Sequence, residues 1–140
     1  MKAARYVAAG MAWVFVAAVV YQVFLAGVGI FGAGGLAPHR DFGYLIPLLS
    51  LVLLVAVAVA RAPSTILPAV LLLVLAGVQT ILPWFRIEAP YVAALHPVNA
   101  LAIGLLGFVI ARRATAFARG TALARPAEGP APAELAAQAD

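Results

Sequence analysis

The sequence contains no cysteine. This absence excludes disulfide bridges, thiolate metal sites, iron–sulfur clusters and the C-x-x-C-H attachment of c-type haem. Charge is also scarce, because only 10% of the 140 residues are charged while 66% are hydrophobic. A soluble domain of this length needs far more polar surface to cover its core. The composition therefore indicates a membrane protein.

Four apolar runs are long enough to cross a bilayer, which takes about 20 helical residues. We expect membrane spans at residues 6–30, 40–60, 65–85 and 91–111. Pro63 and Pro90 suit the starts of helices, where a missing N–H costs little. The first span is longer than the roughly 7–15-residue apolar core of a secretory signal, so we expect it to be retained. The sequence predicts an all-α, four-helix transmembrane bundle over residues 1–118, followed by a disordered cytoplasmic tail, 119–140.

The basic residues indicate how the chain is oriented. Of the nine Lys and Arg residues, all except Arg40 and Arg86 fall on one side of a four-span topology. Cytoplasmic loops carry the excess of such residues, so both termini are predicted to be cytoplasmic, in a multi-pass protein of the bacterial cytoplasmic (inner) membrane. The lipid bilayer is then the main partner. We expect no nucleic-acid binding, because the cations do not interleave with aromatics on a soluble face.

The few polar residues within the spans suggest an internal repeat. Gln22 precedes His39 by 17 residues, and Gln79 precedes His96 by the same number. A shift of 57 residues therefore superposes both pairs. We expect two helical-hairpin repeats, related by an axis along the membrane normal. Such an axis places His39 and His96 on opposite sides of the bundle, at comparable depth in its outer half.

Small residues follow both histidines at helical spacing. They are Gly43, Pro47 and Ser50 after His39, and Ala100, Gly104, Gly107 and Ala111 after His96. Small residues let another helix approach closely, or they leave room for a flat macrocycle. Pro97 is expected to bend the helix beside His96 and to free a backbone carbonyl.

A macrocycle between two histidines predicts a bis-histidine haem b site. The iron takes an axial nitrogen on each face of the porphyrin, one from each of two facing helices. His39 and His96 are the predicted iron ligands. Arg40 and Arg86, the cations on the outer side, would pair with the propionates. Gln22 and Gln79 would orient an imidazole N–H or form hydrogen bonds between helices.

Short motifs around these residues are similar to those of the haem A synthase family. The pieces that carry the resemblance are Gln22–Leu25–Ala26, His39–Arg40–Gly43, Gln79–Leu82 and Leu95–His96–Ala100. That family has two four-helix halves, each with outward-side histidines that frame a haem. The chain resembles one such half over residues 15–111, and also small four-span bacterial membrane proteins that are uncharacterised. It departs from the family at Pro83, where the first motif has Ala26, and it has no acidic residue before a histidine. The resemblance thus implies a haem-binding scaffold for one haem, and the family's catalytic glutamate does not carry over.

The sequence leaves several functions open. Our prediction is a small b-type cytochrome for electron transfer, with a quinone or a redox partner protein, or for haem handling. The alternative is a cofactor-free structural or accessory subunit, in a homo-oligomer or a larger complex, whose Gln and His residues only join helices. A small transporter or channel is less favoured, because the spans are expected to lack the internal charges or broken helices that polar substrates usually need. A zinc site from His39, His96, Asp41 and Glu88 has no support in the spacing. Whether the chain is an enzyme stays open.

Overall fold

The apolar runs of the chain form helices, and no strand occurs among residues 2–121, which this computed structural model describes. Each run is rich in Leu, Ala and Val, and a helix satisfies every backbone hydrogen bond within its own segment, as lipid surroundings require. The elements in chain order are α1 (Lys2–Ile30), α2 (Ala37–Gly43), α3 (Leu45–Val59), α4 (Pro63–Ile81), the 3-10 helix η1 (Leu82–Arg86), α5 (Pro90–Ala93) and α6 (Leu95–Arg119).

The helices combine into four segments that are long and apolar enough to cross a membrane. They are Lys2–Ile30, Ala37–Val59, Pro63–Arg86 and Pro90–Arg119. The prediction of a four-helix, all-α membrane protein is therefore confirmed. The fourth segment continues beyond the predicted end at residue 111, because arginine is a good helix former. It ends where Gly120 adopts a left-handed conformation with φ of 71°. Most of the predicted tail, residues 122–140, lies outside the described residues.

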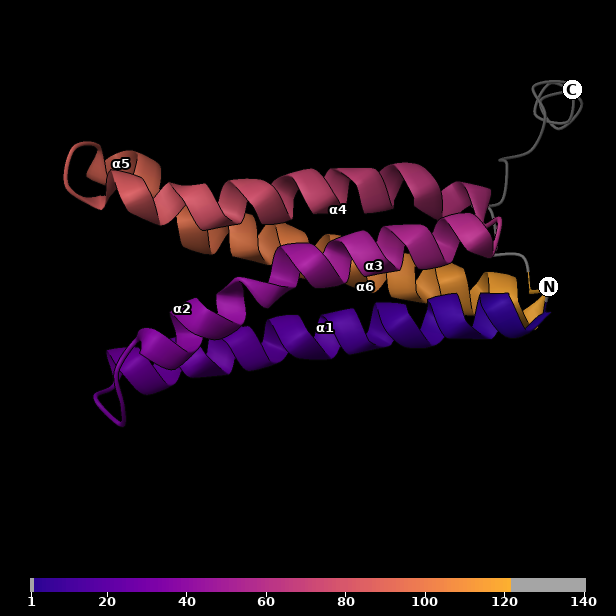
Figure 1. The fold of residues 1–140 in the computed structure, drawn as a ribbon, viewed down its shortest axis with the longest axis horizontal. Helices are drawn as coiled ribbons and strands as arrows, with labels where there is room; N and C mark the ends of the chain where they lie inside the picture. The colour runs from indigo at the N-terminus through magenta and orange to yellow at the C-terminus, as the bar shows by residue number, and fades with distance from the viewer. Residues whose placement is uncertain (1, 122–140) are drawn as a thin grey trace, which may run out of the picture.

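The four long helices form a ring in which each packs against two neighbours. Helix α1 packs against α3 and α6, and α4 packs against the same two helices from the other side. Helices α1 and α4 are therefore diagonal to each other, as are α3 and α6. The start of α1 and the end of α6 lie at one end of the bundle, which we call the terminal end, while α2 and α5 lie at the other, the hairpin end (Figure 1).

Small and medium apolar side chains fill the centre of the ring. Phe15, Leu53, Leu72 and Ile110 are fully buried, together with several alanines of α1, α4 and α6. Many other large apolar side chains are exposed, including Leu67 and Leu101 at 76% and 70%. An apolar surface of this extent is unfavourable in water and suits contact with lipid.

Prolines determine where the second and fourth segments break. Helix α2 ends at Gly43, four residues before Pro47, and α5 ends at Ala93, four residues before Pro97. A proline cannot donate a hydrogen bond to the carbonyl four residues earlier, so the helix is interrupted there. The break that accompanies Pro97 thus lies just before His96, at Ala94.

Candidate functional site

A pair of hydrogen bonds joins Gln22 on α1 to His39 on α2. The side-chain Nε2 of Gln22 donates to the backbone oxygen of His39 at 2.7 Å. In return, the imidazole Nδ1 of His39 lies 3.0 Å from the backbone oxygen of Gln22. We call this reciprocal arrangement a clasp. It fixes the imidazole relative to α1, because both the backbone and the ring of His39 are held.

The second hairpin carries the same clasp. Gln79 Nε2 donates to the backbone oxygen of His96 at 3.0 Å, and His96 Nδ1 lies 3.1 Å from the backbone oxygen of Gln79. The structure therefore pairs each predicted glutamine with its predicted histidine. The detail differs from the expected contact, because the imidazole bonds to the glutamine's backbone and the glutamine's amide bonds to the histidine's backbone.

The clasps determine the tautomer of both imidazoles. A backbone carbonyl can only accept a hydrogen bond, so Nδ1 of each neutral ring carries the proton. The lone pair is then on Nε2, which is left available as an acceptor or a metal ligand. A carbonyl bonded to the Nδ1 proton also fixes the orientation of the ring.

The two histidines come from different hairpins and meet inside the hairpin end of the bundle. Their ring centroids are 6.1 Å apart, and the ring planes are inclined by 76°. Both side chains are half-buried. The structure thus places the two imidazoles next to each other, whereas the repeat axis predicted that they lie on opposite sides of the bundle.

Pro83 explains why the carbonyl of Gln79 is available to His96. In a continuous helix this carbonyl accepts from the N–H four residues later, but that residue is Pro83, which has no N–H. The imidazole of His96 replaces the missing donor. Pro83, a departure from the first motif, therefore supports the clasp.

The clasps differ in a third residue. Asn99 Nδ2 donates to Gln79 Oε1 at 2.7 Å and to the backbone oxygen of Leu75 at 2.9 Å. Asn99 lies three positions after His96, on the same helix face, and this spacing is the signal by which the sequence could have placed it in the site. A shift of 57 residues puts Phe42 at the corresponding place. Since phenylalanine has no donor, Gln22 Oε1 is buried without a hydrogen-bond partner among the described residues.

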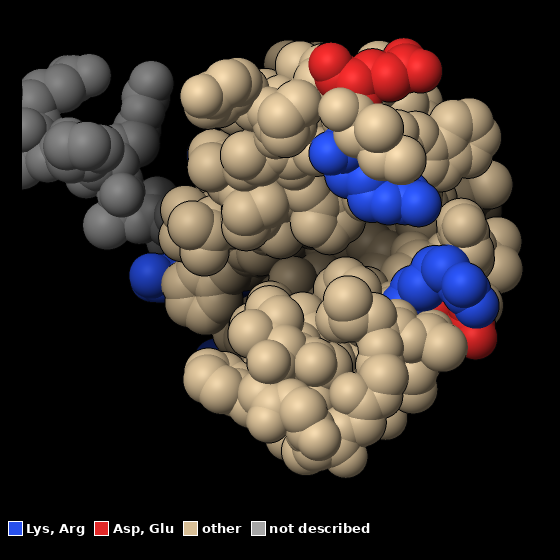
Figure 2. Space-filling view, turned by 90° about the vertical axis from the view of Figure 1, so that its left-hand side faces the viewer, with Lys and Arg blue, Asp and Glu red and all other residues tan. Residues whose placement is uncertain are grey.

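Arg40 and Arg86 lie at the hairpin end, where both are exposed. Arg40 Nε donates to Asp41 Oδ1 at 2.9 Å, and Arg86 is the last residue of η1. Viewed from this end, the molecule is hollowed between its two halves, and basic side chains border the hollow on both sides (Figure 2). The predicted arginines thus come from opposite hairpins, and the structure shows no hydrogen bond from either to a histidine.

The predicted stripe of small residues on α6 packs against α1. A Cβ added at Gly107 would lie 3.0 Å from Phe15 Cδ1, and one at Gly104 would lie 3.7 Å from Val19 Cγ1. These glycines therefore allow close helix approach, one of the two predicted uses.

Within residues 2–121, no three His, Cys, Asp or Glu side chains gather closely enough to hold a metal ion. The four-residue zinc site considered from the sequence is therefore not assembled. The two histidines remain as a pair of nitrogen donors, which suits a metal that brings its own equatorial ligands.

Comparison with known proteins identifies one similarity. Residues 22–85 match a family of unknown function, DUF6220. The match covers less than half of the chain, and it includes the first clasp and Gln79. No curated protein and no solved structure matches the chain.

Proposed function

We propose that this chain is a small membrane b-type cytochrome that binds one haem b between His39 and His96. The observation that carries the proposal is the pair of clasps, which leave Nε2 of both imidazoles as a free donor atom and bring the two rings together from different hairpins. Neutral imidazoles can ligate iron in apolar surroundings without burying a net charge of their own.

The separation of the rings fits an iron between them. A metal about 2 Å from one nitrogen of each ring separates the two ring centres by roughly 6 Å. The observed separation of the ring centroids, 6.1 Å, is close to this distance. Asn99 and Pro83 hold the His96 clasp, and this rigidity favours a preformed site.

The hollow at the hairpin end supports the orientation of the haem. Its propionates would be directed towards Arg40 and Arg86, whose guanidinium groups can bind carboxylates with two parallel hydrogen bonds. Arg40 would have to exchange its contact with Asp41 for a propionate. Gln22 and Gln79 would act on the iron only through the imidazoles that they orient.

A haem held by two histidines supplies one-electron redox chemistry. The role that follows is electron transfer with a quinone or a redox partner protein, or haem handling. The proposal also draws on the resemblance of the short Gln and His motifs to those of haem A synthases, and the match to DUF6220 adds no activity to it.

The recurrence of the clasp also supports a repeated design. Both clasps span 17 residues, and α1 and α4 each pack against α3 and α6, as expected if a two-fold axis relates the two hairpins. We further propose that the terminal end is cytoplasmic, because Lys2, Arg61 and Arg119 and the neighbouring arginines gather there. The histidines then lie in the outer half of a bacterial inner membrane.

The absorption spectrum of the detergent-purified protein tests the proposal. The oxidised protein should show a Soret band, and dithionite should produce sharp α and β bands. Replacing His96 with glycine should abolish these bands, and added imidazole should restore them by occupying the vacated volume. A colourless protein from cells supplied with haem precursor would refute the proposal, as would a spectrum that His96→Gly leaves unchanged.

One observation favours the second candidate, a cofactor-free accessory subunit. The clasps satisfy the Nδ1 hydrogens within each hairpin, and the rings make an edge-to-face contact that itself joins the hairpins. On this account the protein is colourless, and His96→Gly lowers the unfolding temperature without any change in absorption.

A further inference from the structure

The terminal end of the bundle concentrates positive charge. Within residues 2–121, its charged side chains are all basic, whereas Asp41 and Glu88 both lie at the hairpin end. The basic residues are Lys2, Arg5, Arg61, Arg112, Arg113 and Arg119. Such a cluster beside a bilayer attracts anionic lipid headgroups.

Two of these arginines have other partners. Arg5 lies over the Phe117 ring, 4.3 Å from its centroid. Arg113 Nη1 donates to the backbone oxygen of Ser64 at 3.1 Å. Arg112 and Arg119 make no hydrogen bond or ion pair within the described part of the chain.

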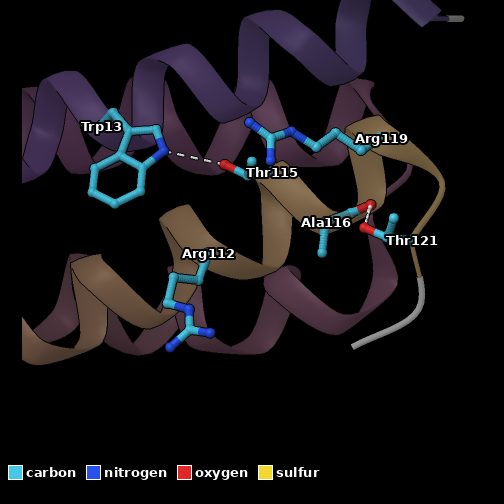
Figure 3. Close-up of a pocket in the computed structure, with 6 residues that line it drawn as sticks. All are labelled: Trp13, Arg112, Thr115, Ala116, Arg119 and Thr121. Carbon is cyan, nitrogen blue, oxygen red and sulfur yellow. Dashed lines mark hydrogen bonds between the residues drawn. The ribbon is translucent and has the colours of Figure 1, made fainter. Parts of the chain in front are cut away.

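Arg112 and Arg119 line one pocket of about 220 Å³ between α1 and α6. Trp13, Thr115, Ala116 and Thr121 complete its lining. Arg119 extends back along α6 beside Thr115, and Arg112 lies on the other side of Thr115 (Figure 3). Arg112 and Arg119 thus line the same opening from positions two helical turns apart on α6, and in Figure 3 the Arg119 guanidinium lies beside Thr115 while that of Arg112 is directed away from it.

The other polar groups of the pocket are already engaged. The Trp13 indole N–H donates to Thr115 Oγ1 at 3.1 Å, and that hydroxyl donates to the backbone oxygen of Ala111 at 2.7 Å. Thr121 Oγ1 donates to the backbone oxygen of Ala116. The guanidinium N–H groups are thus the donors left for a ligand, so the pocket selects for negative charge.

An exposed apolar stripe leads from the pocket along α6 towards the middle of the membrane. Leu101, Leu105 and Phe108 are exposed, and they precede Arg112 at helical spacing. The Phe108 ring also contacts Trp13 edge to face, with 5.7 Å between centroids. An acyl chain can follow this stripe while its headgroup lies at the arginines.

We propose that the pocket between α1 and α6 binds the headgroup of an anionic phospholipid, with its phosphodiester between Arg112 and Arg119 and one acyl chain along Phe108 and Leu105. Trp13 forms the wall of the site at the level of the membrane interface, where tryptophan is favoured. The inference concerns the terminal end and is independent of haem binding.

The test uses Trp13 as the reporter, in full-length protein carrying Trp84→Phe so that it is the remaining tryptophan. The protein is reconstituted in vesicles of brominated phosphatidylcholine, which quenches indole fluorescence, and unbrominated phosphatidylglycerol is added in steps. Phosphatidylglycerol should restore Trp13 fluorescence at a lower mole fraction than unbrominated phosphatidylcholine does. The double variant Arg112→Gln, Arg119→Gln should lose this preference for phosphatidylglycerol. Each arginine is expected to contribute a factor of roughly five to it.

A matched control is Lys2→Gln with Arg61→Gln, which removes two charges from the same end outside the pocket. The control should keep the preference for phosphatidylglycerol. An equal loss in both double variants would show attraction to the whole basic end and would overturn the site. Equal recovery with both lipids would overturn charge recognition. If glycerol phosphate alone shifts Trp13 emission in vesicles without anionic lipid, the ligand is a soluble phosphate and the lipid assignment is wrong.

Discussion

His39 and His96 belong to different hairpins, yet their imidazoles lie edge to face with 6.1 Å between ring centroids. Each ring is held by a hydrogen bond to the glutamine 17 residues earlier in its own hairpin. The contact is therefore made by two rings whose orientations are fixed independently.

The two clasps should differ in strength. Gln79→Leu removes the bond to His96 and leaves Asn99 without its side-chain acceptor, whereas Gln22→Leu removes one side-chain bond. We expect Gln79→Leu to lower the free energy of unfolding by about 1 kcal/mol more than Gln22→Leu does. Reversible unfolding in mixed detergent micelles measures both values. Equal costs would show that the Asn99 bond contributes nothing.

The incomplete clasp of the first hairpin can be completed. Phe42→Asn places a donor where Asn99 stands in the second hairpin, within reach of the buried Gln22 Oε1. The loss of the Phe42 contact with Tyr21 adds a cost that is unrelated to the clasp.

A double-mutant cycle separates these two effects. Phe42→Asn should cost about 1 kcal/mol less in the wild-type background than in a Gln22→Leu background, because the new hydrogen bond forms only when Gln22 is present. The free energies of unfolding of the four proteins give the coupling. A coupling of zero would mean that the asparagine does not reach Gln22.

Gly104 and Gly107 form a matched pair for testing the close approach of α6 to α1. Gly107→Ala forces its Cβ to within 3.0 Å of the buried Phe15 ring, and overpacking of this kind costs about 1–3 kcal/mol. Gly104→Ala meets Val19 at an ordinary 3.7 Å, so the gain in helix propensity should leave stability unchanged or raise it by up to about 1 kcal/mol. Thermal unfolding of both variants checks the contrast, and a destabilised Gly104→Ala would contradict it.

The effects of substituting Arg113 and Pro68 on the free energy of unfolding should depend on each other. Pro68 lies inside α4 and cannot donate to the Ser64 carbonyl, which accepts from Arg113 instead. Arg113→Met should therefore destabilise the protein by about 1 kcal/mol. In a Pro68→Ala background the restored N–H satisfies the carbonyl, and the same substitution should cost less. Additive effects of the two changes on the free energy of unfolding would refute this coupling.

The sequence predicted the four spans well because apolar runs bounded by Pro, Gly and charge directly reflect the requirement to cross a membrane. The ends were less predictable. Lys2 and Arg5 continue α1, and Arg112 and Arg119 continue α6, because long basic side chains can extend to the interface while their backbone stays helical. A criterion based on hydropathy alone ends a span at the first charge.

The spacing of Gln22 with His39 and of Gln79 with His96 was sufficient to pair the site residues. It did not give the bonds themselves, because reciprocal side-chain-to-backbone contacts depend on the relative depth of two helices in a hairpin. Pro83 does carry a local signal, namely a missing donor four residues after Gln79, and Asn99 has a helical spacing from His96. The diagonal packing of α3 and α6 has no such signal, since nearly every face of these helices is apolar.

The ratio of haem to protein in three purified variants tests the central proposal most directly. His39→Ala and His96→Ala each remove one nitrogen donor, while Trp84→Phe changes an exposed aromatic residue at the same end and serves as the control. Circular dichroism verifies that all three variants keep their helices. We expect one haem per chain in the wild type and in Trp84→Phe, and a large loss in each histidine variant. Haem at the wild-type ratio in either histidine variant, or none in the wild type, would contradict the proposal that His39 and His96 together hold the iron.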